Sequence, residues 1–224
     1  NIARMDVDTT RSRKSYEKII SDLENKKIDI LVGTQMLTKG LDFDNVSVVG
    51  VLNADQSMNL PDFRAHEKTY QQLVQVSGRA GRKNKRGTVV IQTSDPSHPV
   101  IKQITSYDYH AMFSQQIKER YLFKYPPYTR LINLTAKHKN VILLEKYSQL
   151  LAQELRLVLG ERVLGPEAPL IEKVNHYYMR QILIKIDQQV SLNKVKKVIK
   201  ERINNVLSKS SFKTVQVIID VDPM

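Results

Sequence analysis

The chain is 224 residues long, carries 35 Lys and Arg against 23 Asp and Glu, and contains no cysteine. This length allows one large or two modest domains, and the missing cysteines exclude disulfides, thiolate metal sites and a cysteine nucleophile within these residues. No apolar run approaches the roughly 18 residues that a membrane-spanning helix needs, so we expect no membrane partner. The absence of cysteine fits a reducing, cytoplasmic setting.

The net charge of +12 is concentrated in the second half of the sequence. Residues 1–112 carry 16 Lys and Arg against 13 Asp and Glu, whereas residues 113–224 carry 19 against 10. A basic domain attracts polyanions by releasing their counterions, which favours a nucleic-acid partner. A well-solvated basic surface is the other interpretation of the same charge.

The first half alternates between strand and helix patterns. Apolar residues at helical spacing predict a surface helix over 12–25, and a second helix is expected from 65 to about 76. Short β-branched runs at 29–33, 46–52 and 87–93 predict strands buried on both faces. This alternation predicts βαβ units and an α/β fold with a mainly parallel sheet. Functional residues are then expected after the strands, in residues 34–43 and 53–55.

The second half predicts a separate, smaller domain. Two helical stretches run to about Phe123, and Pro126-Pro127 ends them because proline excludes the helical conformation from the residue before it. Beyond this boundary we expect strands at 130–136, 181–186 and 215–221 and helices at 141–159 and 192–207. One small sheet with two helices is an α+β arrangement similar in outline to split βαβ folds.

The segment Gln75-Val-Ser-Gly-Arg-Ala-Gly-Arg82 predicts a phosphate-binding arginine pair. ATP hydrolysis spreads negative charge over the γ-phosphoryl oxygens, and a planar, permanently charged guanidinium stabilises that charge. Arg79 and Arg82, three residues apart at a helix end, can face one cleft, while Gly78 and Gly81 allow close approach of the backbone. A basic, glycine-rich turn is the alternative, and it leaves Gln75 unexplained.

A second polar segment, Gly33 to Phe43, lies between two predicted strands. The hydroxyl of Thr34 can bond a nucleic-acid phosphate, and Asp42 can accept a hydrogen bond from a ribose hydroxyl. In this order, and with about forty residues between them, the two segments form a specific pair.

Together the two segments resemble motifs V and VI of superfamily 2 helicases. The run Leu60-Pro-Asp-Phe-Arg-Ala-His-Glu-Lys-Thr-Tyr-Gln-Gln-Leu-Val-Gln-Val-Ser-Gly-Arg-Ala-Gly-Arg82 narrows the resemblance to the replication-restart helicases of the primosomal protein N′ (PriA) family. Further agreement lies in the segments 5–10, 51–55, 124–128, 164–169, 180–185 and 219–223. The resemblance implies a second RecA-like helicase lobe over 1–112, a helical connector over 113–126 and a PriA-type C-terminal α+β domain over 127–224.

The resemblance also implies roles for single residues. Arg79 and Arg82 would act at the γ-phosphate, Gln75, Gly40 and Asp42 would line the nucleotide cleft, and Thr34 and Lys39 would contact DNA. Arg180 and Gln181 match a position associated with docking the tail of single-stranded DNA-binding protein. Tyr177 and Met179 depart from the pattern, because some family members carry arginines there.

A basic helix is expected over Leu192–Leu207, with an apolar face and with Lys196, Lys197 and Lys200 elsewhere on its circumference. Lys196 and Lys200 are candidate contacts to a DNA backbone, and a solvated face is the alternative. The neighbouring tyrosines Tyr177 and Tyr178 either stack on bases or pack against the domain.

The function implied by the resemblance is that of an ATP-dependent 3′–5′ DNA helicase, which recognises branched DNA and assembles the primosome for replication restart. Its cofactors would be ATP and Mg²⁺, and its partners forked and single-stranded DNA, single-stranded DNA-binding protein and other primosome proteins, in the bacterial cytoplasm at the nucleoid. The chain lacks a Gly-x-x-x-x-Gly-Lys-Ser/Thr phosphate loop. We therefore expect a C-terminal fragment that hydrolyses no ATP alone, with the first lobe and a zinc module upstream and no metal site in these residues.

Two other functions fit parts of the sequence. One is a non-catalytic module that binds DNA structures or docks proteins, with a vestigial motor half. The other is an RNA-directed or restriction-type translocase, which shares motifs V and VI but is expected to lack the matching C-terminal domain.

Overall fold

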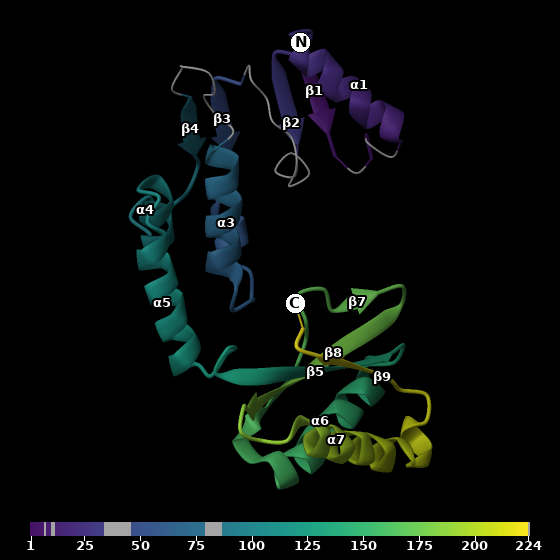
Figure 1. The fold of residues 1–224 in the computed structure, drawn as a ribbon. Coiled ribbons are helices and arrows are strands. Elements are labelled where there is room, and N and C mark those ends of the chain that lie inside the picture. The colour runs from purple at the N-terminus through teal and green to yellow at the C-terminus, as the bar shows by residue number, and fades with distance from the viewer. Residues whose placement is uncertain (7, 10–11, 34–45, 79–86, 224) are drawn as a thin grey trace. The chain divides into compact units, whose positions relative to one another are not determined.

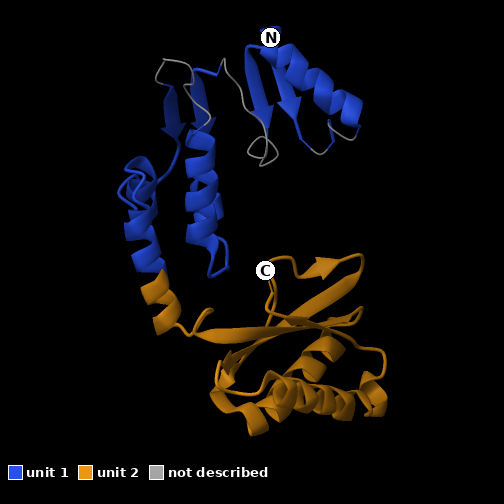
Figure 2. Cartoon of the chain, viewed as in Figure 1, with its two compact units in different colours: residues 1–116 blue, residues 117–224 orange. Residues whose placement is uncertain are grey.

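The computed structural model describes residues 1–6, 8–9, 12–33, 46–78 and 87–223. The chain forms two compact units, an N-terminal unit of residues 1–116 and a C-terminal unit of residues 117–224 (Figure 2). Helix α5 (Tyr109–Leu122) runs across the division. The division between residues 116 and 117 lies between the predicted boundaries at residues 112 and 126, which stay predictions.

The N-terminal unit contains two pairs of parallel strands. Strand β1 (Ile2–Met5) pairs with β2 (Ile30–Gly33), and β3 (Val48–Val51) pairs with β4 (Thr88–Ile91). Helix α1 (Arg13–Glu24) connects the first pair and begins at Ser12, whose side chain accepts a hydrogen bond from the Ser15 amide at 3.1 Å. One continuous parallel sheet stays a prediction, because residues 34–45 lie outside the described chain.

The expectation that these strands are buried on both faces was wrong for the described residues. Ile30, Val48 and Val90 are 54%, 62% and 56% exposed. Helix α1 packs on β1 and α3 (Ala65–Ser77) packs on β3. A β-branched run reports strand propensity, whereas burial depends on what covers each face, and the second face has no cover within the described residues.

The core of the N-terminal unit lies between α3 and the helices that follow β4. Helices α2 (Asp55–Met58), α4 (Pro99–Thr105) and α5 supply its other walls. The buried apolar side chains are Ala54, Met58, Tyr70, Leu73, Val100, Ile101, Ile104 and Met112. This core fixes the buried face of α3 and leaves its other face to solvent.

The C-terminal unit is one antiparallel sheet with two helices on a single face (Figure 1). Its strands are β5 (Thr129–His138), β6 (Val163–Glu167), β7 (Lys173–Val174), β8 (Tyr177–Asp187) and β9 (Gln216–Val221). The order is β6-β8-β5-β9, and β7 pairs with the start of β8. The helices are α6 (Val141–Leu159) and α7 (Leu192–Leu207), followed by 3-10 turns at Gly160–Arg162 and Ser210–Phe212.

Strand β8 begins four residues earlier than the sequence indicates. Tyr177 to Arg180 lack a β-branched run, but they continue the pairing with β5 as far as Tyr178 opposite His138. Alternate side chains then face opposite sides of the sheet. Ile182, Ile184 and Ile186 enter the core beneath α6 and α7, and Tyr178 packs against that core. Tyr177 therefore points to the other side.

Hydrogen bonds to the backbone carbonyls of residues 123 and 126 hold the Lys124-Tyr-Pro-Pro-Tyr128 segment. Lys185 Nζ donates to the Phe123 carbonyl at 2.7 Å and lies 3.6 Å from the centre of the Tyr125 ring. Arg120 donates to the Pro126 carbonyl at 3.2 Å. Burial, and to a lesser extent Lys124, lowers the pKa of Lys185. This family motif therefore has a structural role, joining the end of α5 to the sheet.

Gly165 gives a structural reason for the glycine in segment 164–169, another part of the resemblance. Its φ is +90°, and a Cβ atom there would lie 2.7 Å from the Gln181 carbonyl oxygen. The pairing of β6 with β8 shifts register between Leu164 and Glu167. Only glycine satisfies both the backbone angle and this close approach.

No helix among the described residues is long and apolar enough to span a bilayer.

Helix α6 offers a matched test of the core. Leu151 is fully buried and Leu157 on the same helix is 79% exposed. We expect Leu151→Ala to lower the free energy of unfolding by about 2–5 kcal/mol, because it removes packed methyl groups and leaves a cavity. Leu157→Ala should change it by less than about 0.5 kcal/mol. Urea denaturation followed by circular dichroism measures both, and equal losses would contradict the described packing.

Candidate functional site

Most of the predicted nucleotide site lies outside the described residues. Arg79 and Arg82 belong to residues 79–86, and Thr34, Lys39, Gly40 and Asp42 belong to residues 34–45. The described part is Gln75, in the last turn of α3, with Gly78 directly after the helix. The site can therefore be built from the way α3 is anchored.

The buried face of α3 directs Gln75 outward. Thr69, Leu73 and Ser77 are buried, and Ser77 Oγ donates to the Leu73 carbonyl at 2.7 Å. Gln71 and Gln75, four residues apart, share the exposed face. Gln75 thus presents its amide to solvent directly before the predicted arginine pair.

Gly78 follows the last residue of α3, and no described neighbour of Gly78 would exclude a side chain there. Its amide donates to the Val74 carbonyl at 3.0 Å. A Cβ atom there would lie 3.6 Å from the Gln75 carbonyl oxygen, which is an ordinary contact distance. The sequence predicted that Gly78 lets another group approach the backbone closely, and no described residue makes such an approach.

The start of α3 is fixed by Asp62. Its carboxylate accepts a hydrogen bond from the Arg64 amide at 2.9 Å and pairs with Lys68 Nζ at 2.7 Å. Burial opposes ionisation of Asp62, but the bonds from Lys68 and Arg64 outweigh it and lower the pKa of that carboxyl. The guanidinium of Arg64 lies 4.8 Å from the centre of the Phe63 ring. The Asp-Phe-Arg part of the family run therefore has a local structural role.

Asp55 joins the carboxyl ends of β3 and β4. Its carboxylate accepts from Thr93 Oγ1 at 2.5 Å and from the Ser94 amide at 2.7 Å. The Thr93 and Ser94 bonds lower the pKa of Asp55. This acidic residue sits where catalytic groups gather in parallel sheets, yet both of its oxygens have structural partners.

In the C-terminal unit, Arg180 is the centre of an ion-pair cluster. Its Nε atom contacts Glu145 Oε2 and its NH1 atom contacts Glu172 Oε1, both at 2.7 Å, and its side chain is only 13% exposed. Burial disfavours the charged form, but the bonds to both glutamates outweigh it and raise the pKa of Arg180. The bond from Arg180 is the main reason why the pKa of Glu145 is lowered.

This cluster changes how the predicted docking pair is understood. Arg180 links α6, through Glu145, to the chain just before β7, through Glu172. Gln181 is half-buried within the sheet, paired with Thr135 of β5 and with Glu167 of β6. The two residues point to opposite faces of β8. Sequence reasoning missed the cluster because Glu145 is 35 residues from Arg180.

The predicted DNA-contacting lysines lie on the solvent face of α7. Lys196, Lys197 and Lys200 are exposed, whereas Val195, Ile199, Ile203 and Val206 are buried. No ion pair is described for these three lysines within residues 87–223. Residues 113–116 carry no charge, so the C-terminal unit has the same 19 Lys and Arg against 10 Asp and Glu as residues 113–224.

Among the described residues, no group of three His, Cys, Asp or Glu side chains is arranged to hold a metal ion.

Two families match the chain, one for each part. Residues 1–84 match the family described as "Helicase conserved C-terminal domain", and residues 121–224 match "Primosomal protein N C-terminal domain". The similar proteins include three named "Replication restart protein PriA", from Bacillus subtilis, Synechocystis and Haemophilus influenzae. They are 41%, 39% and 35% identical over 99%, 99% and 100% of this chain.

The chain belongs to the PriA family. It spans 28%, 26% and 30% of the lengths of those three relatives. The family predicted from the sequence is confirmed, and the helicase match implies a RecA-like lobe in the first part of the chain. The roles of single residues stay predictions.

The Arg180 cluster can be tested by substitution. We expect Arg180→Ala to lower the free energy of unfolding by about 1–3 kcal/mol, because it leaves two carboxylates without their shared cation. Arg162→Ala is the matched control. Its pair with Asp187 is about half exposed on both sides, 47% and 50%, so its loss should cost less than about 1 kcal/mol. Urea denaturation at pH 7 measures both, and equal costs would contradict a special role for Arg180.

The same cluster predicts a pH dependence. The pKa of Glu145 is lowered in the folded chain. Its stabilising contribution is thus fully present above the ordinary glutamate pKa of about 4.3 and is lost as the pH falls through the lower, folded value. The difference in unfolding free energy between the wild type and Arg180→Ala should therefore shrink in acid. A constant difference between pH 7 and pH 3 would rule out this linkage.

Proposed function

We propose that this chain is the C-terminal part of an ATP-dependent 3′–5′ DNA helicase that recognises branched DNA and assembles the primosome for replication restart. The observation that carries the proposal is the match to PriA proteins along nearly the whole chain, at 41% identity to the Bacillus subtilis protein. We propose forked and single-stranded DNA, single-stranded DNA-binding protein and other primosome proteins as partners, in the bacterial cytoplasm at the nucleoid.

In this proposal the N-terminal unit supplies one wall of the nucleotide site. Gln75 fits a nucleotide, because its exposed amide can donate and accept hydrogen bonds at the end of a helix whose other face is packed in the core. Arg79 and Arg82 stabilise the charge of the transferring phosphoryl group, and Gly40 and Asp42 complete the wall. ATP and Mg²⁺ supply the reactive phosphate and its bridging charge. A first lobe holds them, so the 224-residue chain alone hydrolyses no ATP; zinc belongs to a separate upstream module.

The C-terminal unit contributes DNA binding in this proposal. Lys196 and Lys200 contact the phosphate backbone from the exposed face of α7, while Thr34 and Lys39 contact single-stranded DNA in the motor. Gln181 keeps the proposed docking role, and Arg180 supports it by holding Glu172 and the start of the β7–β8 hairpin in place.

A protein that carries both lobes tests the motor assignment. We expect Arg82→Ala to reduce DNA-stimulated ATP hydrolysis by about 10³-fold or more, because an arginine at the γ-phosphate contributes about 10³ to 10⁵ in rate. Fork binding, measured by fluorescence anisotropy, should stay close to wild type. Near-normal ATP hydrolysis would remove the arginine from the nucleotide site.

The 224-residue chain tests the DNA assignment. We expect the double variant Lys196→Gln, Lys200→Gln to weaken binding to forked and single-stranded DNA alike and to reduce the slope of log affinity against log salt by about 1–2, because each phosphate contact releases counterions. Lys146→Gln, which removes one exposed lysine of α6, is the control and should lower the slope less than the double variant does. An unchanged slope would show that the basic face of α7 is solvated and makes no phosphate contact.

A non-catalytic binding module is the second candidate. The C-terminal unit has its own core beneath α6 and α7 and most of the net positive charge. Titrating the chain with forked, duplex and single-stranded DNA at two salt concentrations tests this candidate, because a binding module retains salt-sensitive affinity without ATP hydrolysis. No binding at low salt would instead assign the charge to protein contacts.

A further inference from the structure

A cavity lies at the end of the C-terminal sheet, between the end of β5, the start of β8 and the segment that precedes β9. Its volume is about 470 Å³, and its walls are His138, Lys139, Asn140, Tyr177 and Thr214. The sheet brings these residues together, because β5 pairs with the start of β8 at His138 and Tyr178 and with the start of β9 at Lys137 and Gln216, which places Thr214 beside His138. Of these residues only Tyr177 was considered from the sequence, as a tyrosine that either stacks on bases or packs against the domain.

The two adjacent tyrosines of β8 are separated by the sheet. Tyr178 packs against the core beneath α6 and α7, whereas Tyr177 lines the cavity. Lys139 Nζ lies 5.5 Å from the centre of the Tyr177 ring. The cavity therefore combines one aromatic ring with a cation held over it.

The polar groups of the cavity are left mainly as donors. The Asn140 amide donates to His138 Nδ1 at 2.9 Å, and with Nδ1 as an acceptor it is Nε2 that donates to Thr214 Oγ1 at 3.1 Å. The hydroxyl hydrogen of Thr214 then stays available to a ligand. Asn140 Oδ1 accepts from the Leu143 amide at 3.1 Å as the cap of α6, which leaves the NH₂ group of Asn140 to donate.

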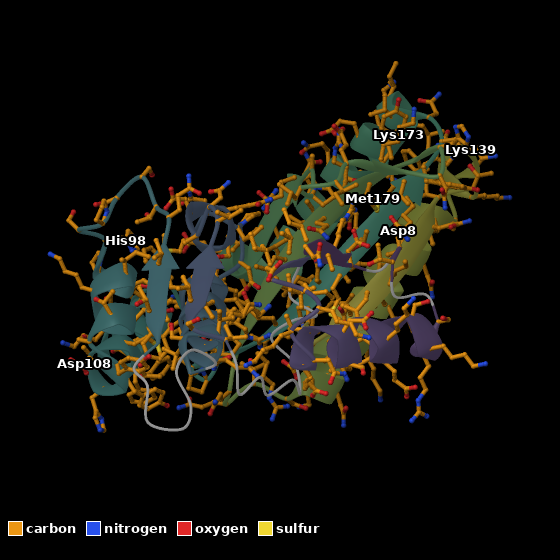
Figure 3. The ribbon with its side chains drawn as sticks, turned by 90° about the horizontal axis from the view of Figure 1, so that it is seen from above. Asp8, His98, Asp108, Lys139, Lys173 and Met179 are labelled. Atoms are coloured by element: carbon orange, nitrogen blue, oxygen red, sulfur yellow. The ribbon has the colours of Figure 1, made fainter. Side chains whose placement is uncertain are left out.

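The charge around the cavity favours an anion. Its five walls contain a lysine and no carboxylate. Lys137, Lys173 and Lys213 lie on the adjoining segments, and Figure 3 shows Lys139 and Lys173 at the same end of the unit. The nearby carboxylate of Glu172 is already paired with Arg180. An acceptor-rich, negatively charged group can thus enter without meeting an unpaired acid in the walls.

We propose that this cavity binds one nucleotide of single-stranded nucleic acid, with its base against the Tyr177 ring and its phosphate at Lys139. A nucleotide offers both features at once, since every base has a π-face that stacks on an aromatic ring and every phosphate is an anion. Thr214 and Asn140 donate hydrogen bonds to base or phosphate oxygens. The inference rests on the proposed DNA binding of the C-terminal unit and adds a base-contacting site to it.

An acidic peptide is the competing ligand class. Its carboxylates would satisfy Lys139 and the donors, but they would leave the Tyr177 ring without a stacking partner. The two ligands differ in what the ring contributes, so a probe without bases separates them.

The experiment compares the 224-residue wild-type chain with Tyr177→Leu, Tyr177→Phe and Lys139→Gln. Fluorescence anisotropy measures binding of a labelled oligodeoxythymidylate, an abasic oligodeoxynucleotide of the same length, and an oligo-aspartate peptide. We expect Tyr177→Leu to weaken oligodeoxythymidylate binding about 5- to 20-fold, in the range of base stacking, and to leave abasic DNA binding unchanged. Tyr177→Phe should bind like wild type, and Lys139→Gln should weaken both DNA probes.

Matched controls separate this site from folding and from general charge. Tyr121→Leu removes another exposed aromatic ring of the same unit, 69% exposed, and Lys146→Gln removes another exposed lysine; both should bind oligodeoxythymidylate like wild type. Circular dichroism melting checks that each variant folds.

The outcomes are distinct. Equal affinity of Tyr177→Leu and wild type for oligodeoxythymidylate overturns the nucleotide cavity while leaving the proposed DNA binding in place. An effect of Tyr177→Leu and Lys139→Gln on the peptide alone overturns it in favour of a peptide site. Absence of DNA binding by the wild-type chain at low salt overturns the proposed DNA binding itself.

Discussion

The antiparallel pairing of β5 with β8 holds the C-terminal unit together. It runs along the whole of β5, from Thr129 opposite Asp187 to His138 opposite Tyr178, and both edge strands are attached to one of these two. Because side chains alternate along a strand, this single register decides which residues enter the core and which face away from α6 and α7. A slip of one residue would bury Tyr177, Gln181 and Lys185 and expose the isoleucines.

Helix α3 depends on different constraints, namely local hydrogen bonds that define its two ends and apolar packing that holds it in the core. Asp62 fixes its first turn through the Arg64 amide and Lys68, and the buried Ser77 fixes its last turn. Asp55 ties the strands on which the helix packs. Tyr70 and Leu73 hold the helix in the core of the unit, so Gln75, which we propose faces the nucleotide, stands on a fixed support.

Local patterns predicted the helices well and the contacts between distant residues poorly. The apolar spacing predicted 141–159 and 192–207, and these are the bounds of α6 and α7. The pattern could not reveal that Arg180 pairs with Glu145 and Glu172, since such pairs arise only when the sheet brings separate segments together. The sequence also could not tell which of Tyr177 and Tyr178 packs against the core, because the register of the strand, and not the residue type, decides which face a side chain occupies. The prediction that the side chains of β2, β3 and β4 are buried on both faces was wrong for a related reason. Whether a strand face is buried depends on the elements packed against it, and the strand's own sequence does not specify them.

Gly165 has a further consequence for how copies of the chain meet. It lies on the edge strand β6, where the shift in register interrupts the ladder, and Pro166 follows it without an amide hydrogen. An incoming strand would find no regular row of donors along this edge. The tight approach that excludes every side chain at residue 165 thereby also protects the sheet from strand-by-strand growth on that side.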